Sequence, residues 1–169
     1  MNGRSLKSRA LQLLAQRDQS RLELRRKLLR QLRREAAVAQ AAGGNCDEAD
    51  AGVDLDERSA AEVETLLDWL ATNGFLSDAR FVESRVHARA PRFGNLRIKN
   101  ELAQHGVTAP AEVVAELAET ELARAGAVRE RRFHEPPESV AERAAQARFL
   151  AGRGFSPEVI HRLLRRLRA

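Results

Sequence analysis

The sequence predicts an all-α protein built from tandem short-helix units, because strand-forming residues are scarce and helix signals recur. Aromatic residues make up only 4% of the 169 residues, with no Tyr and one Trp, so a core must come mainly from Leu, Val and Ala. Such a composition favours helices over a sheet. Start signals followed by apolar residues at helical spacing appear along the whole chain. We expect tandem three-helix repeats that form an elongated, curved helical array.

Helix starts are marked by serines with a glutamate three residues later. In this capping box the Ser hydroxyl and the Glu carboxylate satisfy each other's backbone N–H groups. The pattern occurs at Ser20, Ser59 and Ser139. Three further starts combine a capping residue with proline or an acid in the first turn; they are Ser77 with Asp78, Thr108 with Pro110, and Ser156 with Pro157.

Helix stops are marked by glycines and one proline. Gly74, Gly106 and the pair Gly152 and Gly154 can adopt the left-handed conformation that ends helices, and Pro91 cannot continue one. Two apolar stripes at helical spacing, one beginning at Val63 and one at Val159, support the assignment. The predicted helices cover residues 5 to 16, 20 to 34, 59 to 72, 77 to 90, 95 to 105, 109 to 124, 139 to 151 and 156 to 168.

Charge is unevenly distributed along this basic chain, whose net charge is +5. Residues 1–34 hold eleven Lys or Arg, residues 35–64 hold nine Asp or Glu against one Arg, and residues 123–169 return to eleven Arg. Two basic ends thus flank an acidic stretch. Arg-rich helix faces fit either simple solvation or an anionic partner, and both interpretations stay open.

Composition also suggests where the helical units divide. Residues 35–58 are rich in Ala, Gly and Asp without a wide apolar face, which predicts a frayed helix end followed by a disordered loop, or an acidic tether. Residues 126–137 read as a linker that ends in Pro136-Pro137. We therefore expect a first unit over residues 1–76, a second over 77–125, and a linker with a third, truncated unit over 126–169.

An apolar ladder recurs in three of the predicted helices. Each copy begins at a small residue and continues with apolar residues four and eight positions later. Weak self-similarity of this kind is typical of repeat proteins, whose units bury their stripes against neighbours. The three copies are Ser20, Leu24 and Leu28; Gly94, Ile98 and Leu102; and Ser156, Ile160 and Leu164.

These segments resemble RecX, the bacterial regulator of the RecA recombinase. Ala10–Leu28 with Leu67–Phe81 resembles its first unit, Arg92–Val107 its second, and Arg148–Ile160 its third. The likeness runs in order over nearly the whole chain. The acidic residues 35–58 depart from the family pattern, and the chain ends soon after the helix that starts at Ser156.

The resemblance implies a protein that binds RecA or the RecA filament on DNA and blocks filament extension. It would thereby damp strand exchange, ATP hydrolysis, co-protease activity and the SOS response, and so modulate DNA repair. Two rival classes remain: a helical protein that binds single- or double-stranded DNA directly without RecA, and a general helical adaptor for another protein. Steep salt dependence of DNA binding would favour the former.

The candidate partner-binding residues are cations on the polar faces of the ladder helices. Clustering of cations at a helix N-terminus is unfavourable for the helix dipole, so those around Gly94 favour a partner. Phenylalanines near helix ends, namely Phe75, Phe81, Phe93, Phe149 and Phe155, are expected in the core rather than as base-stacking platforms. The candidates for RecA or DNA binding are Arg21, Arg25, Arg26, Arg92, Arg97, Lys99, Arg148, Arg153, Arg162 and Arg166.

The sequence contains no motif that is typical of a catalytic or cofactor-binding site. The four histidines are scattered, Cys46 has no second cysteine, and Gly43-Gly44 lacks the lysine of a phosphate loop. We therefore expect no metal, no cofactor and no enzymatic activity. The sequence holds no apolar run of the roughly 18 residues that span a membrane. A monomeric, cytoplasmic protein is predicted.

Overall fold

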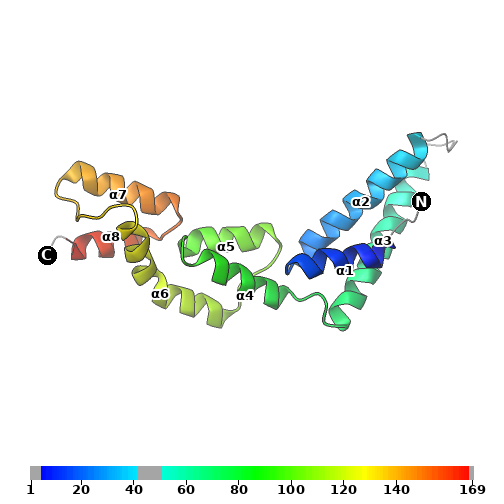
Figure 1. Cartoon of the computed structure of the whole chain (residues 1–169), viewed down its shortest axis with the longest axis horizontal. Coiled ribbons are helices and arrows are strands. Elements are labelled where there is room, and N and C mark those ends of the chain that lie inside the picture. Colours follow the sequence, from blue (N-terminus) through cyan, green and yellow to red (C-terminus); the bar gives the residue numbers. More distant parts are fainter. Residues whose placement is uncertain (1–4, 42–50, 168–169) are drawn as a thin grey trace. The chain divides into compact units, whose positions relative to one another are not determined.

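Helices make up nearly all of the computed structural model, which describes residues 5–41 and 51–167 (Figure 1). Eight helices and no strand occur in these ranges, as the sequence predicts. They are α1 (Leu6–Gln16), α2 (Arg21–Ala41), α3 (Ala51–Thr72), α4 (Asp78–Arg89), α5 (Asn95–Gln104), α6 (Ala111–Glu130), α7 (Val140–Gly152) and α8 (Pro157–Arg166).

The chain divides into two compact units, Met1–Phe81 and Val82–Ala169. In the first, α2 packs against both α1 and α3. Its core contains Leu24 and Leu28 from α2, together with Val63, Leu67 and Leu70 from α3. The apolar stripe predicted from Val63 onward therefore faces the core, which confirms that part of the prediction.

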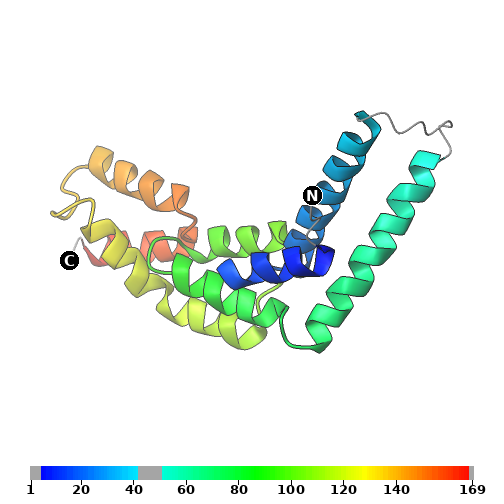
Figure 2. The same cartoon turned by 45° about the vertical axis from the view of Figure 1, so that its right-hand side comes forward.

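In the second unit α6 lies against two sets of helices (Figure 2). It packs on α5 and also on α7 and α8. Ala125 and Val128 of α6 share a core with Leu150, Phe155 and Leu164. Because α6 runs on to Glu130, the prediction that a linker begins at Gly126 is wrong. Burial of the apolar face of α6 in this core outweighs the helix cost of one glycine, about 1 kcal/mol relative to Ala. The division into three units stays a prediction.

The capping boxes are true helix starts at two of the three predicted places. The Ser139 hydroxyl accepts a hydrogen bond from the backbone N–H of Glu142, and the Glu142 carboxylate accepts one from the backbone N–H of Ser139. The Ser20 hydroxyl accepts one from the backbone N–H of Glu23 at 3.1 Å. Ser59 lies inside α3, so the predicted start there is wrong. A capping box is a local signal, and the helix can continue through it when preceding residues are also helical.

Most of the segment predicted as frayed or looped is helical where it is described. α2 continues to Ala41, where the sequence predicts a frayed helix end, and α3 begins at Ala51, so the prediction of a loop is wrong for residues 51–58. Alanine, which has the highest helix propensity, makes up four of residues 35–41. Residues 42–50, including Cys46, lie outside the described ranges, and the tether hypothesis for them stays a prediction.

Three helices end in the same way, at glycines with positive φ. Gly74, Gly106 and Gly154 have φ values of 73°, 71° and 80°, which L side chains rarely adopt. After each glycine, the next residue donates its N–H back to a carbonyl five residues earlier, as Phe155 does to Leu150 at 3.2 Å. This is the Schellman motif. The predicted stops at these glycines are confirmed.

The three apolar ladders are buried as predicted. Leu24, Leu28, Ile98, Leu102, Ile160 and Leu164 all lie in cores. In the second copy the first residue, Gly94, must be glycine for a steric reason. A Cβ on Gly94 would lie 2.2 Å from the Phe155 backbone nitrogen, so only glycine lets α5 approach the turn between α7 and α8.

One buried carboxylate joins the starts of two ladder helices. Glu121 of α6 is 5% exposed, and its Oε1 accepts the backbone N–H of Asn95 at 3.1 Å and that of Ser156 at 3.2 Å. The Ser156 hydroxyl also donates to Oε2 at 3.2 Å. Glu121 thus caps α5 and α8 together, with its negative charge at the positive ends of both helix dipoles.

We predict that Glu121→Gln lowers the free energy of unfolding by about 1–3 kcal/mol. The hydrogen bonds to the helix starts would no longer be made to a charged group, and the amide NH2 of Gln would be a buried donor without an acceptor. Urea unfolding followed by circular dichroism at 222 nm measures the loss. Glu119→Gln, an exposed change on the same helix, serves as control. Equal stability of the two variants would contradict the capping role.

Candidate partner-binding surface

Arg21 and Arg25, two of the three candidate cations on α2, pair with carboxylates of α3. Arg21 binds Glu64 at 2.6 Å and Asp68 at 2.8 Å, and Arg25 binds Glu64 at 2.5 Å. Both carboxylates belong to α3, so these contacts join α2 to α3. The hydrogen bonds from Arg21 and Arg25 lower the pKa of Glu64, and the bond to Glu64 raises the pKa of Arg21. Arg26 lies exposed on the same helix.

The lowered pKa of Glu64 gives a pH-dependent contribution to stability. The pKa of Glu64 is lower in the folded state than its ordinary value. The contribution is therefore present at neutral pH and disappears as the pH falls through the folded-state pKa. We predict that Glu64→Gln loses about 0.5–1 kcal/mol at pH 7, as is usual for partly exposed pairs. As the pH falls through the folded-state pKa of Glu64, the difference in urea midpoint between variant and parent should shrink toward zero. A difference that persists unchanged in acid would refute this.

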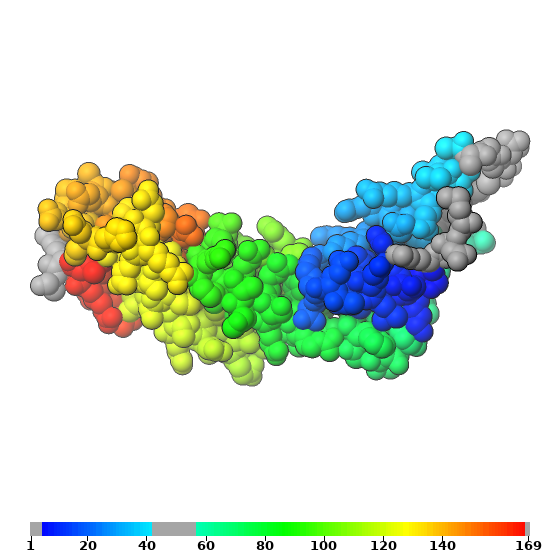
Figure 3. Space-filling view, viewed as in Figure 1, coloured from blue at the N-terminus to red at the C-terminus, as the bar shows by residue number. Residues whose placement is uncertain are grey.

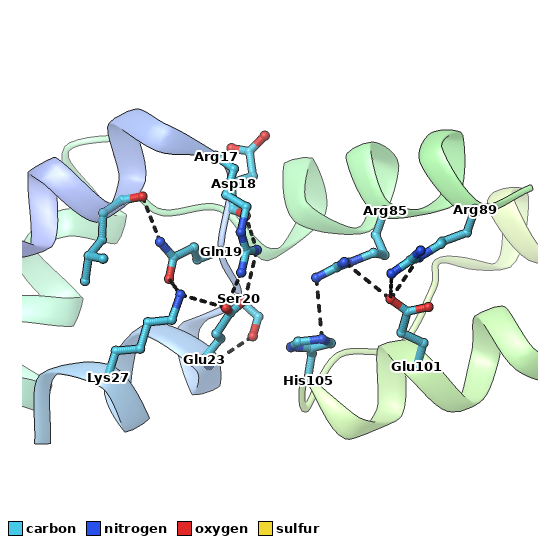
Figure 4. Close-up of polar contacts among 11 residues, drawn as sticks. Arg17, Asp18, Gln19, Ser20, Glu23, Lys27, Arg85, Arg89, Glu101 and His105 are labelled. Carbon is cyan, nitrogen blue, oxygen red and sulfur yellow. Dashed lines mark hydrogen bonds and ion pairs between the residues drawn. The ribbon is translucent and has the colours of Figure 1, made fainter. Parts of the chain in front are cut away.

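The sequence analysis missed a small basic cleft between α1 and α2. Its volume is about 160 Å³, and its lining includes Arg9, Lys27, Arg30 and Arg34. Lys27 also contacts Glu23 at 2.9 Å and Gln19 at 2.9 Å (Figure 4). Arg30 and Arg34 make no hydrogen bond or ion pair within the described ranges. The signal that could have found the cleft is the spacing of the α2 cations by three and four residues.

The candidate cations of the second unit gather partly at the α5 start. Arg97 of α5 lies over the Phe93 ring, 4.3 Å from its centroid, and donates to the Gly152 carbonyl at 3.4 Å. A Cβ on Gly154 would lie 2.4 Å from that of Arg97. Arg153, in the same turn, stands 4.6 Å from the Phe149 centroid. Cation–π contacts of this kind hold guanidinium groups in place while leaving N–H donors for a ligand.

The remaining candidates lie on open surface. Arg92 and Lys99 flank the start of α5, Arg148 lies on α7, and Arg162 and Arg166 are one turn apart on α8. All five side chains are exposed, and within residues 5–41 and 51–167 none makes a hydrogen bond or ion pair. Among the ten candidates, Arg21 and Arg25 are therefore paired with α3, Arg97 and Arg153 are held over aromatic rings, and these five are open to solvent.

Other arginines of the second unit serve its internal packing. Arg85 and Arg89 of α4 both contact Glu101 of α5, at 3.3 and 2.9 Å (Figure 4). Arg124 donates to the Phe93 carbonyl at 2.8 Å, and burial lowers its pKa. Arg129, 3% exposed, donates to Gln146 at 2.9 Å. These side chains are bound to the fold rather than offered to a partner.

The aromatic residues follow the prediction in part. Phe81 and Phe155 are buried, and Phe93 and Phe149 are half-buried beneath arginines. Phe75 is 47% exposed and stacks on Trp69 with centroids 5.7 Å apart, so its placement in the core was wrong. It directly follows Gly74, where the chain reverses at the surface.

Neither a metal cluster nor a membrane helix marks the described ranges. No group of three or more His, Cys, Asp or Glu side chains there could hold a metal ion. Among the helices described, none is both long and apolar enough to cross a membrane. Exposed cations stand out instead in the second unit, on α5, α7 and α8 and in the turn before α5.

Short helices in repeated three-helix arrangements define the class of this protein, and comparison with known proteins defines its family. Residues 77–111 match the description "RecX, second three-helix domain" and residues 119–164 match "RecX, third three-helix domain". The second match places α6 with α7 and α8, as the shared core does.

Curated relatives match over most of their length. The regulatory protein RecX of Ralstonia nicotianae is 46% identical over 162 residues, covering 95% of this chain and 86% of the relative. That of Leptothrix cholodnii is 43% identical over 163 residues, covering 95% and 88%. The crystal structure of RecX from Lactobacillus salivarius shares the fold, with a TM-score of 0.62 at 16% identity over 96% of this chain and 94% of that one. The chain belongs to the RecX family.

Proposed function

We propose that this protein regulates the RecA recombinase without being an enzyme. In this proposal it binds RecA or the RecA–DNA filament and blocks filament extension. Strand exchange, ATP hydrolysis and co-protease activity then fall, and with them the SOS response and recombinational DNA repair. The observation that carries the proposal is membership of a family whose curated members are named regulatory proteins, at identities up to 46% over nearly the whole chain.

The distribution of open cations supports binding to a charged partner. Arg92, Lys99, Arg148, Arg162 and Arg166 are exposed in the second unit, on α5, α7 and α8 and in the turn before α5. Open arginines pair bidentately with carboxylates or phosphates, both of which a filament of protein on DNA presents. Arg97 and Arg153, held over aromatic rings, extend this set. Arg21 and Arg25 contribute less, because α3 carboxylates already occupy them.

The proposal also covers the state and place of the protein. A cytoplasmic monomer meets RecA on DNA directly, and no cofactor is required because binding alone obstructs extension. The exposed cations would keep such a monomer soluble through its net charge. Catalysis plays no part in this scheme.

We predict that this protein suppresses the ATPase activity and strand exchange of RecA on single-stranded DNA. Both activities should fall as its concentration rises to a micromolar excess. The double variant Arg97→Glu, Lys99→Glu should need at least about tenfold more protein for the same inhibition, since two attractive contacts become repulsive. RecA ATP hydrolysis and joint-molecule formation are the measurements.

A control is Arg85→Gln, Arg89→Gln, which removes two cations that bind Glu101. Circular dichroism of each variant establishes that it is folded. Unchanged RecA activity at micromolar excess of the parent would overturn the proposed function. Full inhibition by the Arg97→Glu, Lys99→Glu protein would overturn only the assignment of these two residues.

The basic cleft between α1 and α2 favours a second candidate, direct DNA binding without RecA. Its four cations line a space of about 160 Å³, and two of them, Arg30 and Arg34, have no acidic partner in the part of the chain described. Guanidinium groups around such a space would fit a backbone phosphate.

For this candidate we predict a salt-dependent affinity for DNA in the absence of RecA. Each phosphate contact contributes a slope of about 0.7 for single strands or 0.9 for duplex in a plot of log affinity against log salt. Arg30→Gln, Arg34→Gln should lower the slope by roughly two contacts, whereas Arg21→Gln, Arg25→Gln should leave it nearly unchanged. Fluorescence anisotropy with labelled DNA measures both. A slope unaffected by the first variant would remove the cleft from consideration.

A further inference from the structure

An apolar groove runs between α7 and α8 and has a volume of about 700 Å³. Its lining on α7 follows one helix face, at positions 140, 144, 147 and 151, which are spaced by three and four residues. Val140 is 84% exposed and so contributes nothing to the core. The apolar residues of the groove include Val140, Ala144, Ala147, Ala151, Ile160 and Leu164.

Small side chains make this face suitable for a second helix. The three alanines have short side chains and leave space above this face of α7. Larger apolar side chains from a partner can therefore enter between α7 and α8. Ile160 and Leu164, which are buried, form the bottom of the groove. Its volume lies within the range of about 300–1,000 Å³ that is usual for binding pockets. Figure 3 shows the surfaces of α7 in orange and α8 in red near the C-terminal end of the chain.

The rim of the groove is cationic. Arg143, Arg148, His161 and Arg165 line it, and no carboxylate belongs to the lining. The Nε of Arg143 is buried and has no hydrogen-bond partner among the described residues. A buried N–H donor without a partner costs about 1–3 kcal/mol, so movement of the Arg143 side chain toward an acceptor brought by a ligand would be favoured.

We propose that this groove binds an acidic amphipathic helix of a protein partner. Apolar side chains of that helix would fill the floor, and its Asp or Glu side chains would reach the arginines of the rim, including Arg143. This is the helix-in-groove mode of recognition, in which anchors recur every three or four residues. An apolar floor disfavours nucleic acid, whose backbone needs polar contacts along the whole groove. The proposal stands apart from the proposed function, because its test contains no RecA.

The test uses the full chain and a fluorescein-labelled synthetic peptide of about 14 residues, which spans about 20 Å as a helix and so matches the length of α7. Leu at helical spacing forms one face of the peptide, and Glu occupies the other. Two control peptides carry Lys in place of Glu, or Ser in place of Leu. Fluorescence anisotropy should show binding of the first peptide and at least about tenfold weaker binding of both controls.

Variants of exposed residues then assign the site without threatening the fold. Arg148→Glu, Arg165→Glu should weaken binding at least about tenfold, and Val140→Ser, which leaves the charge unchanged, about threefold. Arg132→Glu, an equally exposed arginine that does not line the groove, should change it less than twofold. Amide chemical shifts should move along α7 and α8.

Three outcomes would overturn the proposal. One is equal binding of the Glu and Lys peptides, and another is binding that Val140→Ser leaves unchanged. The third is displacement of the peptide by single-stranded DNA or by a second copy of this chain at the same groove, detected as competition or as Val140-dependent dimerisation in sedimentation. The third outcome would also assign the groove to a different occupant.

Discussion

The second unit depends on a negative charge buried among helix ends. Glu121 of α6 accepts the first backbone N–H groups of both α5 and α8, so that one side chain satisfies donors that would otherwise be buried without partners. Gly94 makes the arrangement sterically feasible, because a Cβ there would collide with Phe155. The packing of α5 near the start of α8 therefore depends on the Glu121 carboxylate and on the lack of a side chain at Gly94.

That constraint determines where the open cations lie. α5 carries Arg97 and Lys99, and the turn that α5 contacts carries Arg153, so fixing the helices also fixes these charges. The aromatic rings of Phe93 and Phe149 hold two of the guanidinium groups near the same turn. A preorganised cationic surface loses less side-chain entropy on binding than a set of mobile arginines would. The short segment that fixes the helices thus also presents the cations that we propose bind a partner.

Arginine has opposite roles in different parts of the chain, and the tertiary contacts decide which applies. Arg21 and Arg25 are paired with Glu64, Arg89 with Glu101, and Arg129 is buried against Gln146. Arg148, Arg162 and Arg166 remain exposed. In a sequence with 29 Lys or Arg, the residue type alone cannot separate these groups. Their partners come from other helices, as with Glu64, which lies 43 residues from Arg21 in the sequence.

The sequence by itself determined the helical class, most helix limits, the glycine stops and the three buried ladders, since propensity, capping and apolar spacing act over a few residues. Only the tertiary structure decided that α3 begins before Ser59 and that α6 continues past Gly126. It alone decided that Glu121 caps two helices, and which arginines are neutralised. These outcomes rest on contacts between residues far apart in the chain, whose burial and pairing energies exceed the local preferences that a sequence pattern records.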